Sequence, residues 1–95
     1  MPAFSLVLEV RLDGCASAKS RTTQAETILG KLRKHFNVAV ADLTLNGDGL
    51  GDVATLGFAT VGRTRREARD VLDRVADAVA AHPRAEILKA VFDKM

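Results

Sequence analysis

The chain of 95 residues has no tryptophan, no tyrosine, one cysteine and two prolines. A single cysteine, Cys15, excludes an internal disulfide and is typical of proteins kept in a reducing cytoplasm. No apolar run reaches the length of about 18 residues that a transmembrane helix needs, and no basic segment precedes the first apolar stretch as in a signal peptide. We therefore expect one small cytoplasmic domain over residues 1–95, with no membrane partner.

Residues able to carry catalysis or hold a metal are also scarce. His35 and His82 are expected near opposite ends of two different helices, and with one cysteine they give no metal-ligand spacing. Asn46, Asp48 and Asp52 lie in a glycine-rich segment that lacks the twelve-residue spacing and the terminal glutamate of a calcium loop. We expect no cofactor, no metal and no enzymatic activity.

Hydrophobic periodicity predicts six elements. Residues 4–12 alternate apolar and polar side chains, as in a strand with one buried face. A helix follows, capped by Ser17 or Ser20 and ended by Asn37. Next come a strand over residues 38–45, a turn over residues 46–52 and a strand over residues 53–61. A second helix begins at Thr64 and Glu67 and ends at His82 and Pro83, and a last strand covers residues 86–92. The order βαββαβ predicts an α+β, ferredoxin-like fold, with a four-stranded antiparallel sheet and both helices on one face.

Each predicted helix carries one apolar stripe, which we expect to pack on the sheet. The residues of the first stripe are Ala25, Ile28, Leu29, Leu32 and Phe36. Those of the second stripe are Ala68, Val71, Leu72, Val75, Ala78 and Val79.

Two stretches, KLRKHFNVAVADL (residues 31–43) and ATLGFATVG (residues 54–62), resemble the small bacterial family called domain of unknown function 503 (DUF503), or YlxP-like. The residues that match the family pattern are Ser17, Lys19 and Arg21 at the first helix start, and Phe36, Asn37, Val38, Val40, Ala41 and Asp42 further on. AHPRAEIL is similar to the family's His-Pro link, whereas NGDGLGD replaces its tryptophan-containing loop. The resemblance implies a ferredoxin-like fold, and the translation-factor genes that often lie near family genes point towards ribosomes or RNA.

Basic residues are concentrated around one predicted edge although the net charge is only +2. The two helices should run antiparallel, so that the end of the first lies beside the start of the second. The basic residues placed there are Lys31, Arg33, Lys34, Arg63, Arg65 and Arg66. Arginine at a helix start opposes the helix dipole by about 0.3–1 kcal/mol per charge, while the free N–H groups there favour an anion. This pattern predicts binding to the phosphate backbone of RNA, ribosomal RNA above all.

Two other interpretations of the same edge stay open. It is a merely solvated surface if Arg66 pairs with Asp70 and Arg69 with Asp73 along the helix. It is a site for one small anion or a nucleotide if Gly62 and the N–H groups after Thr64 hold a phosphate. Base stacking on the sheet is not expected, because the chain lacks tryptophan and tyrosine and its four phenylalanines are needed for the core.

The face of the sheet away from the helices is expected to be small and apolar at its centre. The residues that define it are Val7, Thr55, Gly57 and Ala59. Monomers seldom leave a large patch of this kind open, so we predict a homodimer in which this face covers the same face of a second copy. A monomer with a modestly apolar surface is the alternative.

Overall fold

The alternation over residues 4–12 becomes the first strand of a sheet in the computed structural model, which describes residues 1–14, 17–45 and 52–95. The elements in chain order are β1 (Ala3–Leu12), α1 (Ala18–His35), β2 (Ala39–Asp42), β3 (Val53–Val61), α2 (Arg65–Ala80) and β4 (Ala85–Lys94). The order βαββαβ is the one predicted.

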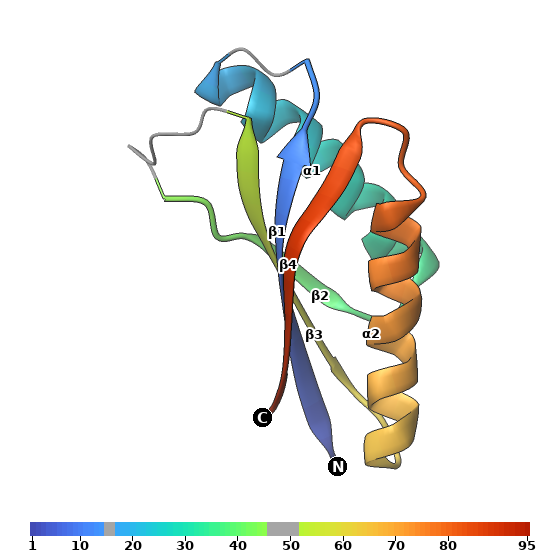
Figure 1. The fold of residues 1–95 in the computed structure, drawn as a ribbon. Coiled ribbons are helices and arrows are strands. Elements are labelled where there is room, and N and C mark those ends of the chain that lie inside the picture. The colour runs from blue at the N-terminus through green and yellow to red at the C-terminus, as the bar shows by residue number, and fades with distance from the viewer. Residues whose placement is uncertain (15–16, 46–51) are drawn as a thin grey trace.

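The four strands form one sheet in the order β2-β3-β1-β4, and every neighbouring pair is antiparallel. Both helices cover the same face of this sheet (Figure 1). The ferredoxin-like fold is therefore confirmed. β1 lies in the centre between β3 and β4, and β2 and β4 form the two edges.

The core lies between the sheet and the helices, where the inward-facing side chains of the strands meet the two apolar stripes. The fully buried side chains of largest volume are Leu6, Leu8, Leu12, Leu56, Leu72, Val10, Val75 and Val79. The predicted stripes are buried except for Phe36 and Ala78, which are partly covered, and Val71, which lies outside the core and lines a hollow on the outward side of α2. Arg21 is buried as well, at 4% exposure, although arginine side chains are mostly exposed in folded proteins. It lies four residues before Ala25 and therefore on the buried side of α1.

Both helix starts follow the predicted capping. Ser17 precedes α1, and its Oγ accepts a hydrogen bond from the backbone N–H of Ser20 at 3.2 Å. Thr64 precedes α2, and its Oγ1 accepts from the N–H of Glu67 at 3.1 Å. Because Ser17 takes the capping position, Ser20 lies inside the first turn of the helix.

The second strand is shorter than predicted, and hydrogen bonds near Asp42 explain why. Asp42 Oδ1 accepts from the N–H of Thr44 at 3.0 Å, which turns the chain out of the strand. At Thr44 a side-chain hydrogen bond takes the place of a backbone one, because its Oγ1 accepts from the N–H of Thr55 at 2.9 Å. The predicted turn covers residues 46–52. Its residues 46–51, which include Asn46 and Asp48, lie outside the described residues, and so does Cys15.

Candidate functional site

The start of α2 presents three exposed arginines, Arg63, Arg65 and Arg66, which we call the arginine end. β3 leads directly into it, because Gly62 and the capping Thr64 follow the strand. Arg63 makes an ion pair along the chain, with 3.3 Å between its Nε and Oε2 of Glu67. This pair replaces the second half of the predicted capping box, because the Glu67 carboxylate is engaged by Arg63.

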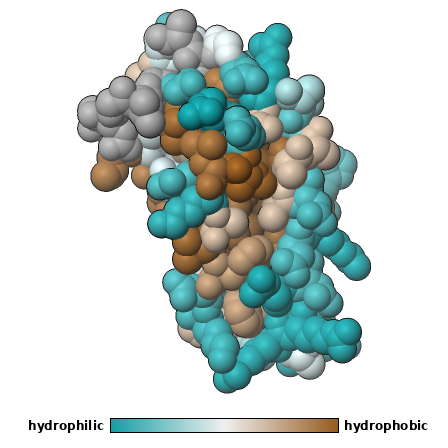
Figure 2. Space-filling model, in the orientation of Figure 1, coloured by the Kyte–Doolittle hydropathy of each residue, from teal (hydrophilic) through white to brown (hydrophobic). Residues whose placement is uncertain are grey.

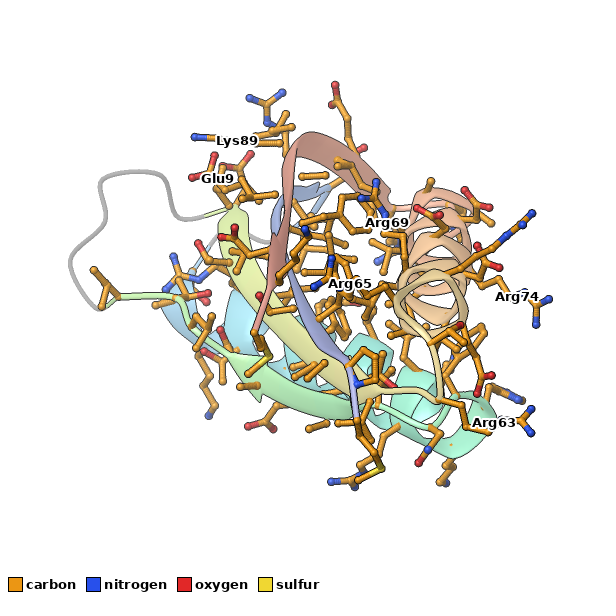
Figure 3. The ribbon with its side chains drawn as sticks, turned by 90° about the horizontal axis from the view of Figure 1, so that it is seen from below. Glu9, Arg63, Arg65, Arg69, Arg74 and Lys89 are labelled. Carbon is orange, nitrogen blue, oxygen red and sulfur yellow. The ribbon has the colours of Figure 1, made fainter. Side chains whose placement is uncertain are left out.

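The arginines of α2 divide between two sides of the helix. In Figure 3, Arg63 and Arg74 point away from the sheet, whereas Arg65 and Arg69 lie between α2 and β4. The guanidinium carbon of Arg69 lies 3.6 Å from the centroid of the Phe92 ring. Arg69 Nε also lies 3.3 Å from Oδ1 of Asp73, so the predicted pair with Asp73 is present. Arg69 is thus held by two partners and Arg63 by one, whereas no ion pair of 4 Å or less to Arg65 or Arg66 is found within the described residues.

The outward side of α2 carries charges of both signs. A shallow hollow of about 280 Å³ is lined by Thr64, Arg66, Glu67, Asp70, Val71 and Arg74. Within the described parts of the chain, no ion pair of 4 Å or less joins Arg66 to Asp70, as the solvated-surface interpretation would require. Two arginines and two carboxylates line this hollow, so its charges balance and it carries no net attraction for a small anion.

Gly62 serves the turn between β3 and α2. Its N–H donates to the carbonyl of Pro2 at 3.0 Å, so it is already used. A Cβ atom on Gly62 would lie 2.9 Å from the backbone N of Ala68 and 3.1 Å from the carbonyl of Thr64. The glycine therefore allows the chain to pass close under the first turn of α2, and its N–H is not free for a phosphate.

The predicted basic edge is divided into two separate groups. Lys31, Arg33 and Lys34 are exposed on the last turns of α1, which we call the α1 end. Lys31 lines a hollow together with Ala78 and His82, so the α1 end lies against the last turn of α2 rather than against the arginine end. In Figure 1, α1 crosses behind α2 instead of lying along it. Periodicity predicts which face of a helix is buried, but not its crossing angle.

The expectation that the two histidines lie at opposite ends is wrong for the same reason. His35 and His82 line the same hollow, which has a volume of about 420 Å³ and an apolar floor of Ile28, Leu32, Phe36 and Ala78. His82 Nδ1 accepts from the backbone N–H of Arg84 at 3.3 Å. Among residues 1–14, 17–45 and 52–95, no group of three or more histidine, cysteine, aspartate or glutamate residues is placed to hold a metal ion. No helix in those ranges is long and apolar enough to span a membrane.

The residues of the predicted dimer face do come together. Val7 pairs with Gly57, and Glu9 pairs with Thr55, across the boundary between β1 and β3. Ala59 lies opposite Ser5 in the same register. All of them alternate with the buried positions of their strands, so they lie on the side of the sheet that the helices leave open.

These features define a small ferredoxin-like domain with an arginine-rich helix start and an open sheet face. The model of the family described as "Protein of unknown function (DUF503)" matches residues 4–91, and the chain belongs to this family. No curated protein matches the chain.

Among solved structures, the chain is similar to the solution NMR structure of LFR1 1, a de novo designed protein with a ferredoxin fold. The TM-score is 0.51 and the identity 11%, over 100% of this chain and 84% of that one. It is also similar to part of the glycopeptide hexose oxidase DBV29 complexed with teicoplanin, with a TM-score of 0.47 and 19% identity over 99% of this chain and 21% of the oxidase. The first likeness shows the fold alone, and the second has too low a TM-score to add to it.

Proposed function

We propose that this protein is a non-enzymatic module that binds the phosphate backbone of structured RNA, with ribosomal RNA as the expected ligand. The observation that supports the proposal is the arginine end, where Arg63, Arg65 and Arg66 are all exposed at a helix start. Glu67 is the one acidic residue in this first turn. Such a surface attracts phosphates without reading a base sequence.

The position of these arginines is electrostatically unfavourable for the helix alone. The first N–H groups of a helix have no acceptor within it, and they give this end a partial positive charge. In α2 the cap oxygen of Thr64 accepts from Glu67, while the N–H groups of Arg65 and Arg66 precede that bond. A phosphate oxygen would relieve the repulsion and accept from the same N–H groups. Binding would therefore use both backbone and side-chain donors.

The α1 end supplies a second basic group on the same helix-covered side of the sheet. Lys31 lines the hollow at the last turn of α2, together with Ala78 and His82, while the arginine end lies at the first turn of that helix. An RNA backbone that follows α2 would pass both groups. The arginine end is the main contact in the proposal, and the α1 end is an auxiliary one.

A site for a single small anion or nucleotide is the alternative, and the geometry supports it less well. The N–H of Gly62 is bonded to Pro2, and Glu67 and Asp70 line the hollow beside Arg66. A thermal-shift series with mononucleotides and inorganic phosphate distinguishes the two ideas. Stabilisation by a mononucleotide without any binding to RNA would favour the small-anion site.

RNA binding is tested by fluorescence anisotropy with a labelled ribosomal RNA hairpin between 50 and 200 mM salt. We expect the affinity to fall steeply with salt. The double variant Arg65→Glu/Arg66→Glu should weaken binding at least about tenfold and reduce the salt slope by about 2, because two phosphate contacts are lost. The variant Lys31→Glu/Lys34→Glu should have a smaller effect.

The matched control is Lys19→Glu/Arg84→Glu. It changes the net charge by the same amount, and both residues are exposed at the opposite end of the molecule, near the start of α1 and the turn before β4. Equal affinities for the control and the Arg65/Arg66 variant would show that the arginine end is not the site. Circular dichroism confirms that each variant is folded.

A further inference from the structure

The open face of the sheet carries side chains in three ordered rows, each running from β2 through β3 and β1 to β4. The central row is Ala41, Gly57, Val7 and Val91. The row on one side, which we call the Asp93 row, is Ala39, Ala59, Ser5 and Asp93. The row on the other side, the Lys89 row, is Leu43, Thr55, Glu9 and Lys89, where Leu43 is placed by the hydrogen bond from its N–H to the carbonyl of Thr55.

The middle of this face is apolar and hollowed. Because Ala39, Gly57 and Ala59 have small or absent side chains, a hollow of about 230 Å³ lies over β3. Leu43, which is 46% exposed, lines this hollow, and Val91, which is 39% exposed, lies on β4 beyond Val7 in the central row. Figure 2 shows apolar surface over β4, bordered on one side by the hydrophilic side chains of α2. The face therefore combines a hollow with side chains large enough to fill one.

The rows on either side of the central row complement each other in size and in charge. The small Ala39 on β2 and the large Leu43 just past its end lie two residues to either side of Ala41. On β4, Lys89 and Asp93 lie two residues to either side of Val91. Figure 3 shows Lys89 beside Glu9 on the side of the sheet away from α2. A half-turn about the central row would exchange the Lys89 row with the Asp93 row.

We propose that this face binds the same face of a second copy about a two-fold axis that runs across the strands along the central row. Leu43 of each copy then enters the hollow beside Ala39 and Ala59 of the other. Lys89 of each copy lies opposite Asp93 of the other, and the valines of the central row pack on themselves. Two-fold contacts of this self-complementary kind are the commonest way in which soluble proteins form oligomers.

Two other arrangements of two copies fit less well. A two-fold axis parallel to the strands would place Lys89 against the apolar Leu43, so a charge would be buried without a partner. Pairing along the free edge of β4 would meet a bulge, because Glu9 pairs with Lys89 while Val10 pairs with Ile87, which leaves Leu88 as an extra residue. Bulges and lysines are features that keep sheet edges from pairing.

Sedimentation equilibrium at micromolar concentration tests the proposal. We expect a species of twice the chain mass of 10.2 kDa. Ala59→Arg fills the hollow and should give a folded monomer, whereas Ala80→Arg, on the exposed last turn of α2, should leave the dimer intact. A 10.2 kDa species that persists as the wild-type chain is concentrated would overturn the proposal.

The axis itself is tested by exchanging charges. Lys89→Asp places two carboxylates opposite each other at two symmetric positions, and the dissociation constant should rise at least about tenfold. Adding Asp93→Lys restores opposite charges only if residues 89 and 93 of the two copies face each other, so the double variant should regain the dimer. If the double variant stays as weak as Lys89→Asp alone, this axis is wrong and the register of the proposal fails.

Discussion

Leu43 lies across the outer surface of Gly57, so closely that a Cβ atom on the glycine would fall 2.6 Å from Leu43 Cδ1. This contact joins a residue just past the end of β2 to the middle of β3. It buries Gly57 although that residue is on the open face of the sheet. The shape of the open face around Gly57 therefore depends on the position of the Leu43 side chain.

Replacing Gly57 tests the contact. Gly57→Val should lower the free energy of unfolding by no more than about 1 kcal/mol, because the branched side chain displaces only the end of the flexible Leu43 side chain, which is 46% exposed. In a Leu43→Ala background this cost should disappear, since the obstructing side chain is gone. Urea unfolding of the four proteins, at one chain concentration because association adds to stability, gives the coupling between the sites. Additive effects would contradict the contact.

Replacing Gly62 and Gly30 by alanine should change the stability of the protein in opposite directions. At Gly62 a Cβ would meet the backbone of Ala68 at 2.9 Å, and backbone cannot swing aside, so Gly62→Ala should destabilise by about 1–3 kcal/mol. At Gly30, inside α1, nothing lies within 4 Å of the added carbon. Gly30→Ala should therefore stabilise by about 0.5–1 kcal/mol through higher helix propensity. Thermal unfolding of both variants measures the two changes in stability. Changes of the same sign would contradict the close packing of Gly62 against the first turn of α2.

Arg69 joins α2 to β4 through the ring of Phe92. Its side chain is 45% exposed, so solvent weakens both this contact and the pair with Asp73. Arg69→Ala should cost about 0.5–1.5 kcal/mol in total. The control Arg74→Ala, on the outward side of the same helix, should stay within about 0.5 kcal/mol of the wild type.

The two contributions of Arg69 can be separated. Phe92→Leu keeps an apolar side chain but removes the aromatic ring. Combining it with Arg69→Ala in a double-mutant cycle should show a coupling of about 0.5–1 kcal/mol. A coupling near zero would mean that Arg69 acts through Asp73 alone.

The fold could be predicted because its determinants are local patterns. The alternation over residues 4–12 and the stripes at spacing three and four fix which faces are buried, and the order of elements then leaves few topologies. Ser17 and Thr64 cap the helices as their side-chain chemistry predicts. The end of β2 could not be predicted from hydrophobicity, because a side-chain hydrogen bond at Asp42 ends that strand within an apolar run.

The candidate site was predictable only in part. The arginine end follows from sequence alone, since Arg63, Arg65 and Arg66 are neighbours along the chain. Its distance from the α1 end depends on how α1 crosses α2, and no periodic pattern contains that angle. Burial of Arg21 was also missed, although its spacing of four from Ala25 was a usable signal. A basic side chain on an apolar stripe is easily assigned to solvent when only polarity is considered.

The position of β1 in the centre of the sheet has a consequence for how the chain reaches its structure. β1 is made first, yet one of its two neighbours is β4, so that Phe4 pairs with Lys94. Until the last strand of ten residues leaves the ribosome, β1 has one edge without a hydrogen-bonded partner. Sheets that depend on pairings between the two ends of a chain fold slowly, because a long loop must close before the contacts form. A nascent chain that ends before Ala85 would therefore leave a central strand of the sheet without one of its two neighbours.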